Sequence, residues 1–163
     1  MRKEDLQGID EICGFMVRPH AETGWAAKTG AGTDGVPGHS KLIEAGVVAL
    51  KDTTDSPYLI PGLETSKQGT RGAALGRAFS LLKTRIGLPA EITFHSFRHT
   101  VSTQLRNAHT DIREVWINRL LGHEATHKSQ GTTTYLTSIS TANLKQTIEA
   151  ISYPETAFAN VTI

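Results

Sequence analysis

The sequence predicts a mainly α-helical domain with a small antiparallel β-sheet, an α+β fold, from three observations. Short β-branched and aromatic segments alternate with glycine turns in the first 37 residues, and four later stretches repeat apolar residues at helical spacing. The 163 residues, 38% of them hydrophobic, are enough for one compact core. We therefore expect one domain with a β-hairpin over about residues 12–37, a helical remainder over about 39–153 and a tail over 154–163.

The N-terminal part carries the predicted sheet. Residues 1–10 mix charges with two apolar side chains, and we expect the end of a helix or a loop there. Residues 12–18 (ICGFMVR) are apolar and rich in strand-forming residues, so they predict a strand. Residues 25–29 and the glycine-rich turn at 30–35 complete two or three short antiparallel strands. Lys28 is then expected near the tip of the hairpin.

Five helices are predicted after the hairpin. Residues 39–49 predict a short helix that Ser40 is able to cap. Amphipathic helices are predicted over residues 73–86, 94–107, 112–121 and 141–151, and Gly122 is expected to end the third of these. Their apolar faces consist of Leu75, Phe79, Leu82 and Ile86; of Phe94, Phe97, Val101 and Leu105; of Ile112, Val115, Trp116 and Leu120; and of Leu144, Ile148 and Ile151.

Residues 92–137 gather side chains that can handle a phosphate and its protons. His95 and Arg98 are three positions apart on one helix, so the imidazole and the guanidinium point the same way. A guanidinium can bind two phosphate oxygens, and a histidine beside it can donate to them or move protons. His123 follows the next helix, and Tyr135 comes twelve residues later, with a phenol that can attack phosphorus as it loses its proton.

These groups, together with Lys28, suit the cutting of a nucleic-acid strand. Arg98, His95 and Lys28 would contact the DNA, and Lys28 would give a proton to the departing sugar oxygen. Tyr135 would form a covalent phosphotyrosine, which keeps the energy of the broken ester so that the strand can be resealed. Such a reaction needs no metal and no cofactor, so we expect neither.

The order of these motifs resembles that of the tyrosine recombinases, the phage integrase family. FHSFRHT, LLGHE and GTTTYL carry the resemblance, which covers roughly residues 5–153. It implies double-stranded DNA as substrate and a partial catalytic domain over residues 1–163. By position, the resemblance makes Lys28 the hairpin lysine, His95 and Arg98 the His-x-x-Arg pair, His123 the histidine after Leu-Leu-Gly, and Tyr135 the nucleophile.

One family feature has no match in this sequence. The family's first arginine belongs to a segment of the type Gly-Leu-Arg-x-x-Glu, which does not occur here, and Arg2 is expected to be an ordinary surface residue. A single preorganised donor can be worth about 10²- to 10³-fold in rate. We therefore expect a poor or inactive recombinase, either a truncated remnant or an isolated fragment.

A second function fits the same fold, namely a non-catalytic DNA-binding or protein-interaction domain. In the family, the helix after the tyrosine packs on a neighbouring protomer. The resemblance therefore implies a homo-oligomer, a tetramer on DNA, in which Leu144, Ile148 and Ile151 form the contact.

A third interpretation comes from residues 123–127, which spell H-E-x-x-H, the helix signature of zinc peptidases. That signature needs one continuous helix. Gly122 precedes it and Gly131 with three threonines follows it, so the context argues against zinc. Glu149 is available as a third ligand, but no motif marks it.

Composition narrows the class of protein further. The single Cys13 excludes a disulfide framework within the chain. The first residues are charged and unlike a secretory signal, and no apolar run approaches the roughly 18 residues of a membrane helix. We therefore expect a cytoplasmic protein without membrane contact. The formal net charge of +1 neither demands nor excludes a nucleic-acid partner.

Overall fold

The computed structural model describes residues 1–21, 34–53, 55–65, 71–123 and 139–157. This part of the chain contains a three-stranded antiparallel sheet and five α-helices, so the predicted α+β class is confirmed. The strands are β1 (Leu6–Ile9), β2 (Ile12–Val17) and β3 (Asp34–Pro37), in the order β1-β2-β3. The helices are α1 (Ser40–Glu44), α2 (Ala73–Arg85), α3 (Phe94–Asn107), α4 (Glu114–Leu120) and α6 (Thr141–Glu149).

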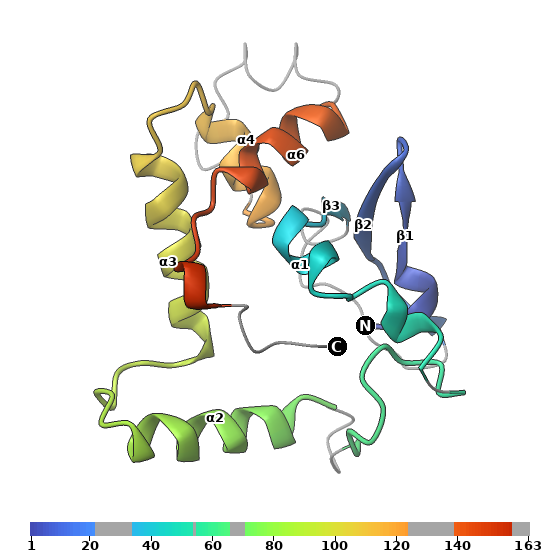
Figure 1. Ribbon diagram of the computed structural model, residues 1–163, viewed down its shortest axis with the longest axis vertical. Coiled ribbons are helices and arrows are strands. Elements are labelled where there is room, and N and C mark those ends of the chain that lie inside the picture. Colours follow the sequence, from blue (N-terminus) through green and yellow to red (C-terminus); the bar gives the residue numbers. More distant parts are fainter. Residues whose placement is uncertain (22–33, 54, 66–70, 124–138, 158–163) are drawn as a thin grey trace.

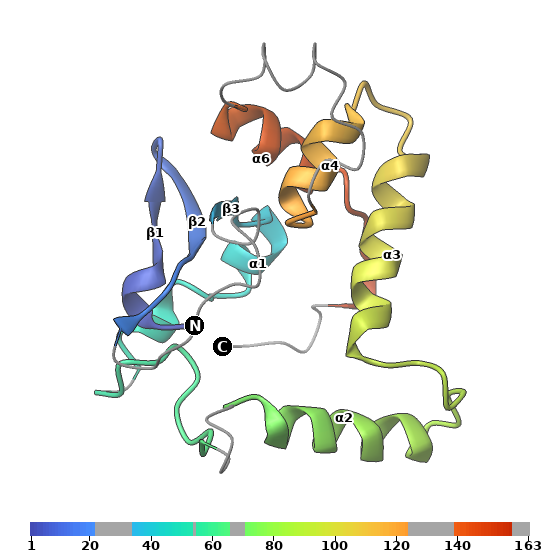
Figure 2. The ribbon, with the colours of Figure 1, turned by 180° about the vertical axis from the view of Figure 1, so that it is seen from behind.

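The sheet and α3 lie on opposite sides of the molecule. In Figures 1 and 2, α3 stands along one side of the molecule and the sheet lies on the other, with α1, α4 and α6 between them. The helix α2 crosses the foot of α3. Among the described helices, none has both the length and the apolar character that crossing a membrane requires.

The strand β1 was not predicted. It pairs antiparallel with β2, and Ile9 lies opposite Ile12 across a two-residue turn. The turn residues Asp10 and Glu11 have φ values of 48° and 67°, the left-handed conformation that such hairpin turns require. Glycine or asparagine usually marks these positions, so the turn has a weak sequence signal. The prediction of a helix end or loop over residues 1–10 is therefore wrong for Leu6–Ile9.

The strands β2 and β3 pair antiparallel, from Gly14 opposite Pro37 to Val17 opposite Asp34. A Cβ added at Gly14 would come 2.8 Å from the carbonyl oxygen of Val36, so glycine permits this close approach. The connection between the two strands contains residues 22–33 and therefore Lys28, which lie outside the described residues.

The start of α1 differs from the prediction. His39 caps this helix, because its Nδ1 accepts a hydrogen bond of 3.0 Å from the backbone N–H of Lys41. The hydroxyl of Ser40, the predicted cap, instead donates to Glu149 at 2.7 Å. The helix also ends at Glu44, well before the predicted end at residue 49.

A hydrophobic cluster joins α3, α4 and the segment after α6. It consists of Leu105, Ile117, Leu121 and Ile151, each at most 8% exposed. Because these side chains come from three separate elements, their burial holds α3 and α4 together. This cluster is therefore the apolar contact between the two helices.

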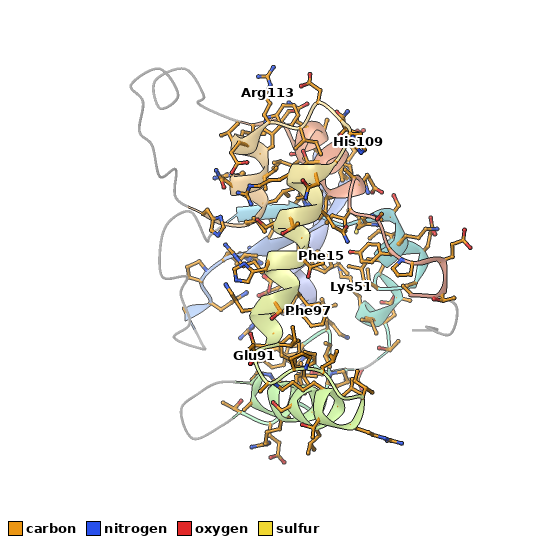
Figure 3. The ribbon with its side chains drawn as sticks, turned by 90° about the vertical axis from the view of Figure 1, so that its left-hand side faces the viewer. Phe15, Lys51, Glu91, Phe97, His109 and Arg113 are labelled. Atoms are coloured by element: carbon orange, nitrogen blue, oxygen red, sulfur yellow. The ribbon has the colours of Figure 1, made fainter. Side chains whose placement is uncertain are left out.

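The apolar faces of α2 and of the first half of α3 lie outside this cluster. Phe94 and Phe97 are 51% and 57% exposed and pack on Phe79 of α2, with ring centroids 4.7 and 5.6 Å away. Figure 3 shows Phe97 on the part of α3 nearest α2. Leu82 and Ile86 of α2 are also more than half exposed. Helical spacing identifies an apolar face but not the element that covers it.

The apolar side of α6 packs inside the chain. Leu144 and Ile151 are 5% and 7% exposed, and Ile148 packs against the hydrophobic cluster. Side chains already covered in this way have little surface to offer a second copy. The burial of these side chains within the chain therefore does not support the predicted protomer contact.

A polar network ties α1 to α6. The carboxylate of Glu149 accepts hydrogen bonds from the backbone N–H of Ser40 at 2.9 Å and from its hydroxyl at 2.7 Å, and it pairs with Lys145. Burial alone would raise the pKa of Glu149, but the hydrogen bonds from Lys145 and Ser40 lower it from 4.5 to about 2. Glu149 thus has structural partners of its own, which argues against its use as a zinc ligand.

Replacing Leu105, which is 2% exposed, tests the hydrophobic cluster. Leu105→Ala should lower the free energy of unfolding by about 2–5 kcal/mol, because it leaves a cavity between α3 and α4. Leu81→Ala on α2, where the side chain is 74% exposed, is the matched control and should change it by less than about 1 kcal/mol. Urea denaturation measures both, and equal losses would contradict the assignment of the core.

Glu149→Gln tests the polar network through its pH dependence. The folded pKa of Glu149 is depressed, so its stabilising contribution is present above about pH 4.5 and is lost as the pH falls toward 2. The variant should therefore be less stable than the wild type in urea at pH 7, with the difference shrinking over this window. Glu44→Gln, which removes only an exposed pair with Lys41, should have little effect at any pH. A loss that does not depend on pH would contradict this account.

Candidate functional site

One face of α3 carries polar side chains at helical spacing. Because each of them lies three or four positions from another, they share one side of the helix, which we call the α3 polar stripe. The helix begins just before this stripe, where the backbone N–H of Thr93 donates to the hydroxyl of Ser96 at 3.0 Å. The α3 polar stripe consists of His95, Arg98, His99, Ser102 and Arg106.

The first turns of the stripe hold His95, Arg98 and His99. The rings of His95 and His99 meet edge to face, with centroids 4.9 Å apart. Arg98 is half-buried, and within the described ranges of the chain no carboxylate pairs with it. A guanidinium matches the paired oxygens of a phosphate.

The end of α4 presents His123. Gly122 has a φ of 60°, and its N–H donates to the carbonyl of Arg119 at 3.1 Å, while the N–H of His123 donates to that of Asn118 at 2.9 Å. This pair of hydrogen bonds is the Schellman motif, whose left-handed residue is usually glycine. The predicted helix end at Gly122 is confirmed, and the backbone of His123 is held against the last turn of α4.

The charges of the α3 polar stripe reach the imidazole of His123. Partial desolvation lowers the pKa of His123, and the positive charges of Arg98 and Arg106 lower it further. His95 lowers it as well, whereas Glu114 raises it. His95 and Arg98 lie on α3, His123 follows the last turn of α4, and all three residues are at least partly exposed. The lowered pKa leaves His123 mainly neutral at pH 7 and able to accept a proton.

The other two predicted site residues lie outside the described part of the chain. Lys28 belongs to the connection between β2 and β3, and Tyr135 belongs to residues 124–138, between α4 and α6. The same segment contains His127, the second histidine of the H-E-x-x-H pattern. His123 itself follows the left-handed end of α4, so no helix that includes α4 runs through that pattern.

The stripe lies apart from a hollow elsewhere in the molecule. A cavity of about 730 Å³ between α1 and the end of α6 is lined by His39, Glu149 and Tyr153 among others, and shares no residue with the stripe. Small molecules usually bind in such concave places. The stripe residues instead follow one another along α3, the helix in the centre of the view in Figure 3, and such a row suits an extended anion.

A cluster of Glu4, Asp5 and His20 has metal-ligand residue types within 4.8 Å of one another. One ring nitrogen of His20 lies 2.9 Å from Asp5 and the other lies 3.3 Å from Glu4, while Arg18 also bonds Asp5 at 3.2 Å. Both ring nitrogens of His20 therefore face carboxylates, and the guanidinium of Arg18 already supplies a positive charge beside Asp5. The cluster is an ion-pair network that anchors the sheet.

Arg2 is not an ordinary surface residue. Its side chain is 18% exposed, its guanidinium carbon lies 5.7 Å from the ring centroid of Tyr58, and the two residues form a β-bridge. The aromatic face covers the cation, which the sequence does not reveal. The N-terminus lies beside the sheet and away from α3 in Figures 1 and 2, so Arg2 is not part of the α3 polar stripe.

The sequence interpretation missed the continuation of the stripe. Arg106 bonds Glu114, the first residue of α4, through Nη2 to Oε1 at 2.5 Å and through Nε to Oε2 at 3.2 Å. The helical spacing from His95 and Arg98 extends to Arg106 and was the available signal. The identity of its partner depends on how α3 and α4 cross, which spacing does not give.

The fold and the site define an α+β domain whose surface gathers histidine and arginine side chains suited to a phosphate. Residues 37–138 of the 163-residue chain match the phage integrase family, the tyrosine recombinases, and the chain belongs to this family. The matched range contains His95, Arg98, His123 and Tyr135, and Lys28 lies before it. Comparisons with curated proteins and with solved structures gave no match. The family inferred from the motifs is therefore confirmed.

Arg98→Gln tests whether α3 and α4 bring the guanidinium of Arg98 close to the imidazole of His123. Because the charge of Arg98 lowers the pKa of His123, its removal should raise that pKa toward the ordinary value of 6.5. An NMR titration of the histidine ring signals measures this. Arg85→Gln on α2 removes the same charge elsewhere and should leave His123 unchanged. If the pKa of His123 responded equally to both variants, the proposed effect of Arg98 on His123 would be contradicted.

Proposed function

We propose that this protein is a site-specific DNA recombinase or integrase, which cleaves and rejoins DNA strands through a 3′-phosphotyrosine. The observation that supports this proposal is that His95 and Arg98 share one face of α3 and His123 is exposed at the end of α4, which packs on α3, in a member of the phage integrase family. Three groups able to bind phosphate or move protons thus come from two helices that pack against each other.

The proposed reaction assigns a role to each residue. Arg98 binds the non-bridging oxygens of the phosphodiester, and His95 donates to one of them, so that the charge of the transition state is stabilised. The phenol oxygen of Tyr135 attacks phosphorus and its proton passes to His123, whose lowered pKa keeps the imidazole neutral. The bond to the 5′ sugar oxygen breaks, and Lys28 gives that oxygen a proton.

The reverse of this step rejoins the strands. A 5′ hydroxyl from the same or another strand attacks the phosphotyrosine, and the phenol leaves with its proton restored. The bond energy stays within the ester throughout, so neither nucleotide nor metal takes part in the proposed cycle. Exchange of the attacking strand converts cleavage into recombination.

The rate is proposed to be low for this chain. The sequence has one arginine in a family motif, Arg98, where the family has two. A missing preorganised donor is worth about 10²- to 10³-fold. Trapping of the covalent intermediate, which accumulates product over hours, is therefore a better assay than turnover.

Double-stranded DNA is the proposed partner, held by Arg98, His95 and Lys28. Recombination joins two duplexes, so we propose a homo-oligomer assembled on DNA. The apolar side of α6 is buried within the chain, so this assembly must use other surfaces. The alternative is a non-catalytic DNA-binding domain of the same family, which would bind the duplex without forming an ester.

A DNA duplex nicked close to the cleavage position separates these two functions, because the short product diffuses away and the protein stays linked. The wild-type chain should form a covalent adduct that migrates more slowly in a denaturing gel. Tyr135→Phe should abolish it, since the variant lacks the attacking oxygen. Tyr153→Phe also removes one tyrosine hydroxyl, but from a ring that packs on His39 outside the stripe. This variant should still form the covalent adduct. DNA binding without any wild-type adduct would favour the non-catalytic alternative.

A further inference from the structure

The last turn of α3 and the first turn of α4 are joined by one ion pair, between Arg106 and Glu114. We propose that these two residues form a positioning pair that holds His123 in register with His95 and Arg98 for strand cleavage. This inference rests on the proposed function. Neither residue belongs to the motifs that identify the family in this sequence.

The geometry of the pair fixes an orientation as well as a distance. Two guanidinium nitrogens of Arg106 meet the two carboxylate oxygens of Glu114 at 2.5 and 3.2 Å, and a third donates to the hydroxyl of Ser102. The planar fork of an arginine allows such a pair in few relative orientations. Arg106 is thus fixed on α3 by Ser102 and fixes Glu114 in turn.

The pair acts on a short and rigid connection to His123. The helix α4 has seven residues, Glu114 is its first, and the Schellman motif at Gly122 locks the backbone of His123 to its last turn. A shift at the start of α4 therefore moves its end as one body. The charges of Arg106 and Glu114 also act on the pKa of His123, in opposite directions.

Packing alone leaves this register loosely defined. The cluster of Leu105, Ile117 and Leu121 draws α3 and α4 together, but apolar contact is not directional. The ion pair between Arg106 and Glu114 restricts the orientation of α4 relative to α3. Its side chains are 41% and 56% exposed, and exposed pairs contribute little to overall stability, so position is the larger consequence.

Direct contact between Arg106 and the reacting phosphate does not fit the structure. Arg106 comes eight residues after Arg98, which corresponds to about 12 Å along a helix axis. Its guanidinium is also occupied by Glu114 and Ser102. Arg106 is therefore a positioning residue, and Arg98 remains the phosphate-binding arginine of α3.

Charge reversal and rescue test the pair in the full chain. Arg106→Glu and Glu114→Arg should each slow formation of the covalent adduct by about 10- to 100-fold at saturating DNA, because small displacements of a catalytic group cost rates of this order. The double variant restores an ion pair and should regain most of the lost rate. The urea midpoint of each single variant should stay close to that of the wild type.

The matched control is another exposed pair, Lys41 with Glu44 on α1, whose atoms lie 2.9 Å apart. Lys41→Glu and Glu44→Lys make the same charge changes far along the chain from α3 and α4, and they should leave the adduct rate unchanged. Single variants of Arg106 and Glu114 that react as fast as the wild type, or a double variant as slow as the singles, would overturn the proposal.

A readout without cleavage separates this inference from the proposed function. The NMR signals of the His123 ring should shift in both single variants and move back toward the wild-type positions in the double variant. If the wild type forms no adduct but these shifts occur, the recombinase function fails while the positioning of His123 by the pair stands. Signals of His123 that stay unchanged in the single variants would overturn the pair itself.

Discussion

The packing of α3 against α4 is the constraint on which the rest of the structure depends. Leu105 on α3 meets Ile117 and Leu121 of α4 in a buried cluster that Ile151 closes from the segment after α6. This contact, together with the Arg106–Glu114 ion pair, holds α4 against the helix that carries the polar stripe. His95 and Arg98 would otherwise be two side chains on a lone helix, without a third group to share a substrate.

The same packing brings positive charge together at the surface. Arg98 and Arg106 both act on His123, and Glu114 offsets part of their effect. Cations held in this way repel one another, and an anion between them relieves the repulsion. A phosphodiester would therefore be attracted to this place and would in turn favour the protonated form of His123.

Sequence reasoning predicted the features that depend on local chemistry. The bounds of α2 and α3, the strand β2 and the end of α4 at Gly122 follow from spacing and turn residues, and the motifs gave the family. It failed where the outcome depends on contacts between distant segments. The inward face of α6, the exposed Phe94 and Phe97, and the cap at His39 each depend on which element lies opposite, and neither spacing nor propensity encodes that.

The central claim is that the α3 polar stripe and His123 together face a DNA phosphate backbone. Titration of the labelled chain with a short duplex, followed by NMR of the histidine and arginine side chains, tests it most directly. The account predicts that the largest shifts fall on His95, Arg98 and His123 and weaken as salt is raised, as contacts to phosphates do. Shifts confined to the cavity between α1 and α6, around His39 and Lys41, would contradict it.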